Sequence, residues 1–250
     1  METTVRIIAF FLLCVCSALS AGQPILVMTE EFKPYQYEGL NGKAEGFSVA
    51  LVRQVFERAK VPIRDGAIQL YPWARGYRYV STQADTALFM MTRTPGRETK
   101  FKWVGPLAPR KVWLYGLSDR KLALHSLQQA KERTVASYND SAMTNYLTEL
   151  GFKNLELVSG QGQLVLMLLR GRVDLIPSVD VMIESQLRGM DFPVDIVEKQ
   201  IILDDRSDFH IALSLSTPDK VMNRLQKALD EMITSGDYQT LFNAYFEGEK

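Results

Sequence analysis

A threonine and an arginine five residues apart could together bind a carboxylate. Residues 86–91 form a mostly apolar run that indicates a buried strand, and Thr92 follows it directly. A Thr-Pro-Gly turn then leads to Arg97. A guanidinium offers two parallel N–H donors to a carboxylate, and a hydroxyl adds a third hydrogen bond. We predict that Arg97 and Thr92 bind a ligand carboxylate. The alternatives are a solvated arginine paired with Glu98 or Asp85, and a threonine that satisfies strand-end backbone.

Two aromatic residues follow other predicted strands. Phe32 comes shortly after the apolar segment 25–28, and Trp73 follows Pro72 at the start of a predicted helix. We predict that both rings form walls of the same cleft, where Trp73 could stack on a cation or a ring of the ligand. Either ring could equally well belong to the hydrophobic core.

Polar side chains also stand at two predicted helix starts. Asp140 and Ser141 precede one helix, and Asp180 opens another. Free N–H groups at a helix start attract anions, so these residues are predicted to contact the ligand. The alternative is an ordinary N-cap, which is what Asp and Ser form at many helix starts.

Strand-like and helix-like segments alternate along the chain. The predicted helices include 46–60, which has apolar residues on one face, and also 161–170 and 180–188. This alternation is typical of α/β layers. A unit in the middle of the chain suggests two lobes, which we place at 23–116 together with 206–250, and at 117–205. Two crossings between lobes would act as a hinge, and sites in such folds lie between the lobes.

The first 22 residues have the pattern of a secretory signal peptide. Arg6 precedes the apolar run 7–15, and small residues follow it. A transmembrane anchor is the alternative, but the run is shorter than the ~20 residues that span a bilayer. Cys14 and Cys16 lie inside this segment, so the exported chain would have no cysteine. We expect the mature protein to be soluble in the periplasm.

The composition argues against several classes of function. The 250 residues include 29 basic and 29 acidic side chains, so there is no electrostatic case for binding nucleic acid or an anionic membrane. His125 and His210 are far apart and lack spaced carboxylate partners, so no metal site is expected. No nucleotide-binding or hydrolase motif occurs in a suitable context, and we expect no cofactor.

Six short segments together resemble family 3 of the bacterial solute-binding proteins, the polar amino-acid binders of ABC importers. They are the Phe-Lys-Pro-Tyr loop at 32–37, Gly46-Phe47, the segment 92–97, the segment 126–135, Gly-Arg-Val-Asp at 171–174, and Ser-Gly-Asp-Tyr at 235–238. Each segment is weak evidence alone, but their order spans nearly the whole mature chain.

The resemblance implies a two-lobed α/β fold of the type II periplasmic-binding class, with a hinge between the lobes. It also implies a monomer that captures a small solute and delivers it to an ABC permease in the inner membrane. In this family, the segment 92–97 corresponds to the carboxylate grip, which adds to the prediction for Arg97 and Thr92.

One departure from the family pattern concerns the ligand's ammonium group. The family has an aspartate five residues after the aspartate of its Gly-Arg-x-Asp segment, and here that position is Val179. Asp180 lies one residue later and could take the role if the loop bulges. Two other functions stay open: ligand sensing for a membrane receptor, and an enzyme resembling cyclohexadienyl dehydratases. For the enzyme, Asp180 and Glu184 are the candidate general acids in the second lobe.

Overall fold

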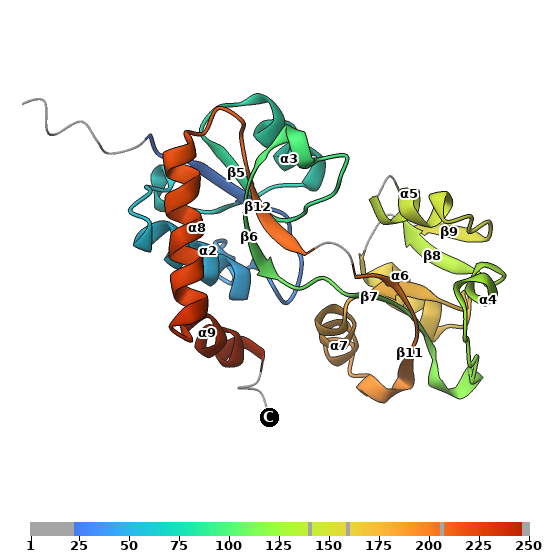
Figure 1. Cartoon of the computed structure of the whole chain (residues 1–250). Helices are drawn as coiled ribbons and strands as arrows, with labels where there is room; N and C mark the ends of the chain where they lie inside the picture. Colours follow the sequence, from blue (N-terminus) through green and yellow to red (C-terminus); the bar gives the residue numbers. More distant parts are fainter. Residues whose placement is uncertain (1–22, 140–141, 159–160, 206–207, 247–250) are drawn as a thin grey trace, which may run out of the picture.

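The computed structural model describes residues 23–139, 142–158, 161–205 and 208–246. Figure 1 shows two lobes, and the chain crosses between them twice. The predicted signal peptide, residues 1–22, lies outside the described residues, as do Asp140 and Ser141. Within the described residues, no helix is both long and apolar enough to cross a membrane.

Lobe 1 is built on a five-stranded sheet with the order β4-β1-β5-β12-β6. Its strands are β1 (Leu26–Thr29), β4 (Gln69–Leu70), β5 (Thr86–Thr92), β6 (Lys102–Ala108) and β12 (Phe209–Leu213). β1 runs parallel to both β4 and β5, whereas β12 is antiparallel to β5 and β6. The carboxyl ends of β1 and β5 therefore lie at the same edge of the sheet, and this edge faces lobe 2 (Figure 1).

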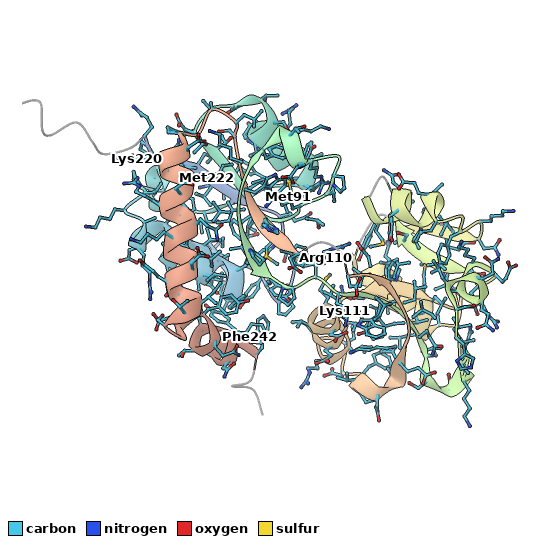
Figure 2. All side chains as sticks on the ribbon, viewed as in Figure 1. Met91, Arg110, Lys111, Lys220, Met222 and Phe242 are labelled. Carbon is cyan, nitrogen blue, oxygen red and sulfur yellow. The ribbon has the colours of Figure 1, made fainter. Side chains whose placement is uncertain are left out.

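Helices cover both faces of this sheet. They are α2 (Phe47–Arg58), α3 (Trp73–Thr82), α8 (Asp219–Thr234) and α9 (Asp237–Phe246). The apolar face of α2 is completely buried, because Phe47, Leu51 and Val55 recur at helical spacing and pack in one core with Leu225 and Leu229 of α8. Figure 2 marks this layer by Met222 on α8 and Phe242 on α9.

A small hairpin and four 3₁₀ turns occur among the described residues in addition to the longer elements. The hairpin pairs β2 (Tyr37–Glu38) with β3 (Ala44–Glu45), and the 3₁₀ turns are η2 (Arg64–Gly66), η3 (Glu98–Lys100), η4 (Ser118–Arg120) and η5 (Val194–Ile196). The N–H of Ser48 donates to the carbonyl oxygen of Tyr35 at 2.9 Å, which fixes the start of α2 beside the loop that carries Phe32.

Lobe 2 has a three-stranded antiparallel sheet and a two-stranded parallel one. The first has the order β10-β7-β11 and the second pairs β8 with β9. The strands are β7 (Val112–Leu117), β8 (Val135–Tyr138), β9 (Leu155–Val158), β10 (Ile176–Ser178) and β11 (Val197–Asp204). The helices are α4 (Leu127–Lys131), α5 (Ala142–Glu149), α6 (Gln161–Leu169) and α7 (Asp180–Arg188).

The strand pairing moves the start of lobe 2 from the position predicted from sequence. Residues 112–116 were placed in lobe 1, but they belong to β7, whose partners β10 and β11 are both strands of lobe 2. We therefore propose that the first crossing lies at 109–111, ahead of Val112. The second crossing joins β11 to β12, and Figure 2 shows Arg110 and Lys111 at the passage between the lobes.

Candidate ligand-binding site

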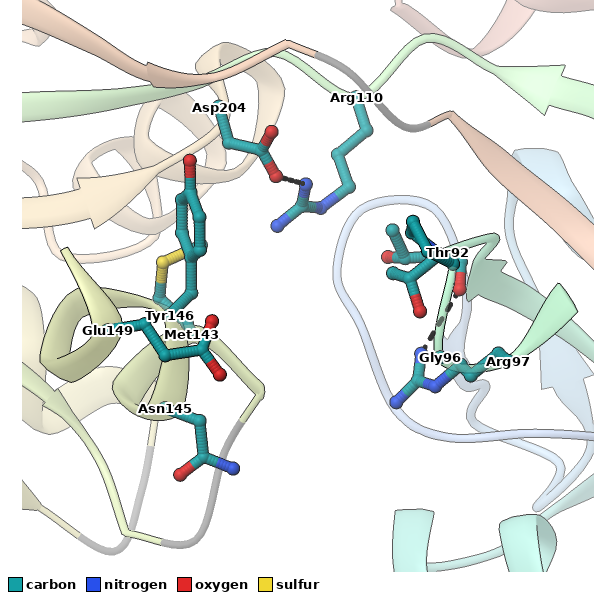
Figure 3. A pocket seen from close by; sticks show the side chains of 11 residues that line it. Thr92, Gly96, Arg97, Arg110, Met143, Asn145, Tyr146, Glu149 and Asp204 are labelled. Carbon is teal, nitrogen blue, oxygen red and sulfur yellow. Dashed lines mark hydrogen bonds and ion pairs between the residues drawn. The ribbon is translucent and has the colours of Figure 1, made fainter.

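A cleft of about 570 Å³ lies between the two lobes. Lobe 1, lobe 2 and the crossings all contribute to it. The lining residues are Thr92, Thr94, Pro95, Gly96, Arg97, Arg110, Met143, Asn145, Tyr146, Glu149 and Asp204. Figure 3 shows Thr92 and Arg97 on one side and the α5 residues Asn145 and Glu149 facing them across the cleft. A ligand that touched both walls would hold the lobes together.

The lobe 1 wall carries the predicted pair Thr92 and Arg97. Thr92 ends β5, and the turn that follows brings Arg97 back so that its Nη1 donates to the carbonyl oxygen of Thr92 at 3.1 Å. The guanidinium carbon of Arg97 lies 5.3 Å from the ring centroid of Trp73 and 5.4 Å from that of Tyr77. The two rings hold a cation at the cleft wall by cation–π attraction. Burial lowers the pKa of Arg97 from its ordinary value.

The alternative partners of Arg97 do not bind it. Glu98 instead accepts two hydrogen bonds from Arg93, at 2.8 Å from Nε and 2.6 Å from Nη2. Within the described part of the chain, no carboxylate lies within ion-pair distance of Arg97. A partly buried guanidinium without a counter-ion is a ready binding group for an anion.

A buried ion pair ties the two crossings together. Arg110, between β6 and β7, places Nη1 2.7 Å from Oδ2 of Asp204, the last residue of β11, and these side chains are only 14% and 11% exposed. The backbone N–H of Arg110 also donates to Oδ1 of Asp208 at 3.2 Å. Both members of the pair line the cleft (Figure 3). Sequence analysis missed them, because charges in different crossings give no local signal of pairing.

This pair should contribute measurably to stability. We expect a double-mutant cycle of Arg110→Met and Asp204→Asn to give a coupling of about 1–2 kcal/mol, since exposed pairs contribute less and this one is largely shielded from water. Urea unfolding of the four proteins measures it. A coupling indistinguishable from zero would show that the two charges act independently.

A smaller apolar annex of about 140 Å³ opens beside the cleft and shares Arg110 and Met143 with it. Phe32 lines the annex, and its ring centroid lies 5.7 Å from that of Phe209 in an edge-on contact. Phe32 packs against core residues of both lobes, so it stands where they meet. Phe32 therefore lines the annex rather than the cleft that holds Arg97, and it also packs against the core as the alternative prediction had it.

The predicted ligand residue Asp180 is engaged elsewhere. Its carboxylate accepts a hydrogen bond from the hydroxyl of Tyr115 and lies 2.6 Å from Nζ of Lys199. It lines neither the cleft nor the annex, while the preceding residue, Val179, does line the annex. The bulge that would turn Asp180 toward the ligand is absent, since α7 begins regularly with Val179 as its N-cap.

Two other residues considered from the sequence, Trp73 and Glu184, do not line the cleft. Trp73 lies behind Arg97 and supports it, rather than standing among the residues that line the cleft. Glu184 is 46% exposed, has Arg188 at 4.0 Å, and lines neither cavity. No group of three or more potential ligand side chains able to hold a metal ion occurs among the described residues.

Glu30 is a candidate that the sequence did not reveal. It follows β1 directly and comes to the sheet edge where Thr92 ends β5. Burial raises the pKa of Glu30 to about 7, against a smaller lowering by the positive charge of Arg97. Its charge is also felt by Tyr138 of lobe 2. Glu30 therefore changes charge near neutral pH beside the guanidinium that would bind a carboxylate.

Solved structures share this architecture at low sequence identity. A histidine kinase sensor domain with similarity to periplasmic binding proteins has a TM-score of 0.74 at 18% identity, covering 90% of this chain and 96% of its own. For the arginine-, lysine-, histidine-binding protein ArtJ from Geobacillus stearothermophilus the values are 0.73, 16%, 90% and 96%. For AncCDT-1, an ancestral amino acid-binding protein and precursor of cyclohexadienyl dehydratase, they are 0.72, 17%, 89% and 95%.

These similarities confirm the predicted two-lobed type II periplasmic-binding fold. No curated protein sequence gives a significant match to the chain. The profile of the bacterial extracellular solute-binding proteins, family 3, matches residues 25–248, which is nearly all of the chain after the first 22 residues. The chain is a member of that solute-binding family.

Proposed function

We propose that this protein captures a small carboxylate-bearing solute in the periplasm by closure of its two lobes. The observation that carries the proposal is the Arg97 guanidinium, which lines the cleft without a carboxylate partner among the described residues. The Thr92 hydroxyl lies beside it in the same wall (Figure 3). Together they offer a planar fork and a hydroxyl to one carboxylate.

Closure would follow from contacts that only the closed state provides. Arg97 would hold the ligand on lobe 1, and Asn145 and Glu149 on α5 of lobe 2 face it across the cleft. A ligand favours the closed state by the free energy of those additional contacts, and the two crossings absorb the rotation. The proposed partner is an ABC permease that binds the closed form, with the protein acting as a monomer.

An enzymatic role is the second candidate, and Glu30 is the observation that favours it. Loss of carbon dioxide and water from a prephenate-like ring breaks the bond to the carboxylate carbon, and the electron pair of that bond aromatises the ring as the hydroxyl leaves. The leaving hydroxyl needs an acid that protonates it to water, and a carboxyl with a pKa of about 7 is suited to this. Glu30, like Asp180 and Glu184, is not among the residues that line the cleft, but it lies close enough to Arg97 for their charges to interact.

The test is native mass spectrometry of residues 23–250 as purified, followed by a thermal-shift screen after unfolding and refolding to remove any ligand. The screen should include amino acids, organic acids and polyamines. We expect an organic carboxylate to co-purify or to raise Tm without being consumed, with stabilisation growing as RT ln(1 + [L]/Kd).

Other outcomes separate the alternatives. Consumption of prephenate or arogenate would favour the enzyme. Stabilisation by polyamines but by no carboxylate would contradict the assigned role of Arg97. If the protein binds a carboxylate and cells without the protein still take that carboxylate up, a receptor-coupled sensor would be favoured over transport.

A further inference from the structure

The annex has a mostly apolar lining contributed by both lobes, to which Ser178 and Gln186 add uncharged polar groups. Phe32 and Phe209 come from lobe 1, and Tyr138, Val179 and Met182 come from lobe 2. Val179 is 8% exposed and Met182 is 7% exposed, so water reaches little of either side chain. A ligand group that entered the annex would therefore exchange water for apolar contacts on opposite sides, and it would bridge the lobes as it did so.

Charge is nearly absent from this space. Among the described residues that line it, Arg110 is the one charged side chain, and its guanidinium is already paired with Asp204. Asp180 is adjacent in sequence but bonds Tyr115 and Lys199 instead. Burial raises the pKa of the Tyr138 hydroxyl, which therefore stays neutral. A cation in the annex would lose its hydration and gain no carboxylate, and this is costly.

The volume of the annex limits what can enter. An apolar cavity of roughly 150 Å³ in another protein stays dry and binds benzene. The annex, at about 140 Å³, is of that size. It can hold one six-membered ring or a branched chain of comparable volume. A long alkyl chain or a fused ring system would not fit without displacing Phe32 or Met182.

We propose that the ligand is a carboxylate attached to one compact apolar body, either aromatic or branched aliphatic, with no charge on that body. The carboxylate would lie at Arg97 and Thr92, and the apolar body would enter the annex past Met143, which lines both cavities. The inference rests on the proposed capture of a carboxylate and adds the chemical class of the solute.

The test is a series of carboxylates that differ in apolar volume, measured by calorimetry on residues 23–250 stripped of ligand. Acetate, butanoate, 3-methylbutanoate and phenylacetate form the series. We expect affinity to rise about fourfold for each buried methylene until the annex is filled. The paired probes pentanoate and 4-aminobutanoate differ by an ammonium group in place of the terminal methyl group, and we expect the second to bind at least tenfold more weakly.

Variants then place the apolar body. Val179→Phe would fill the annex and is expected to weaken phenylacetate at least tenfold while changing acetate less than threefold. Leu157→Phe introduces the same phenyl ring on β9, where Leu157 is 49% exposed and outside both cavities, and should change the affinity for neither ligand. Thermal unfolding checks that Val179→Phe is folded, and the unmodified protein's series decides the question if it is not.

The outcomes distinguish this inference from the function on which it rests. Equal affinity along the series, or glutamate binding tighter than phenylacetate, would overturn the apolar class while leaving carboxylate capture intact. A steep series that is unchanged in Arg97→Ala would keep the annex and remove the carboxylate clamp. The absence of binding by any carboxylate would overturn both.

Discussion

Arg97→Ala is expected to weaken binding of the carboxylate ligand by about 10- to 150-fold. The substitution removes two charge-assisted hydrogen bonds made by a partly buried guanidinium, and such bonds contribute about 1.5–3 kcal/mol. The fold should survive, because the Arg97 side chain donates one hydrogen bond to backbone, at the carbonyl oxygen of Thr92, and otherwise contacts only Trp73 and Tyr77 in its own lobe. Isothermal calorimetry with the solute found in the thermal-shift screen measures the loss.

Arg93 provides a matched control in the same loop. It is also an arginine, but Glu98 already occupies its guanidinium, and it does not line the cleft. Arg93→Ala should change affinity less than threefold. Arg97→Lys should fall between the native protein and Arg97→Ala, since an ammonium keeps the charge but not the planar fork. Equal losses in the Arg93 and Arg97 variants would indicate that the loop's structure, rather than a direct contact, matters.

The fold could be predicted where local pattern and tertiary structure agree. The helix over 180–188 starts and ends as its sequence predicts, because its apolar residues follow helical spacing. The strand β6 was missed, since Gly105-Pro106 interrupts its apolar run and proline is rare inside sheets. β6 stands at the edge of the sheet, where a missing N–H donor is tolerated.

The site could be predicted only where its parts are close in sequence. Thr92 and Arg97 belong to one strand end and one turn, so their proximity is local. Arg110 and Asp204 meet because two crossings run side by side, which depends on the strand order of both sheets. The ion pair of Asp180 with Lys199 could not be predicted from sequence either. Lys199 comes from β11, and an aspartate in the first turn of a helix does not indicate which distant residue it will pair with.

Glu30→Gln is expected to change how stability depends on pH. Burial raises the pKa of Glu30 in the folded protein to about 7, from an ordinary value of 4.5. Between these values the folded state binds more protons than the unfolded state, so the free energy of unfolding falls as pH rises. The loss reaches about 3 kcal/mol above pH 7. Glutamine cannot ionise, so the variant should exceed the native protein by about that amount at pH 8 and match it near pH 4.5.

Urea unfolding between pH 4.5 and pH 8 measures this difference, and Glu31→Gln is the matched control. The Glu31 side chain is 58% exposed and lies 3.6 Å from Lys33, so its removal should leave the pH profile unchanged. Parallel profiles for the native protein and Glu30→Gln would mean that Glu30 is ionised in the folded state at ordinary pH.

Protonation of Glu30 is also expected to affect the affinity for the ligand. An anion at Arg97 would be repelled by an ionised Glu30, so the carboxylate should bind more tightly as pH falls through 7, with proton uptake on binding. Arg97 is the charged group that interacts with Glu30 at this wall, and the neutral hydroxyl of Tyr138 lies close enough for the charge of Glu30 to raise its pKa. Glu30→Gln should make affinity nearly independent of pH between 6 and 8. Calorimetric titrations in buffers with different ionisation enthalpies would reveal the proton taken up on binding. Tighter binding at high pH would instead place a cationic group of the ligand at Glu30.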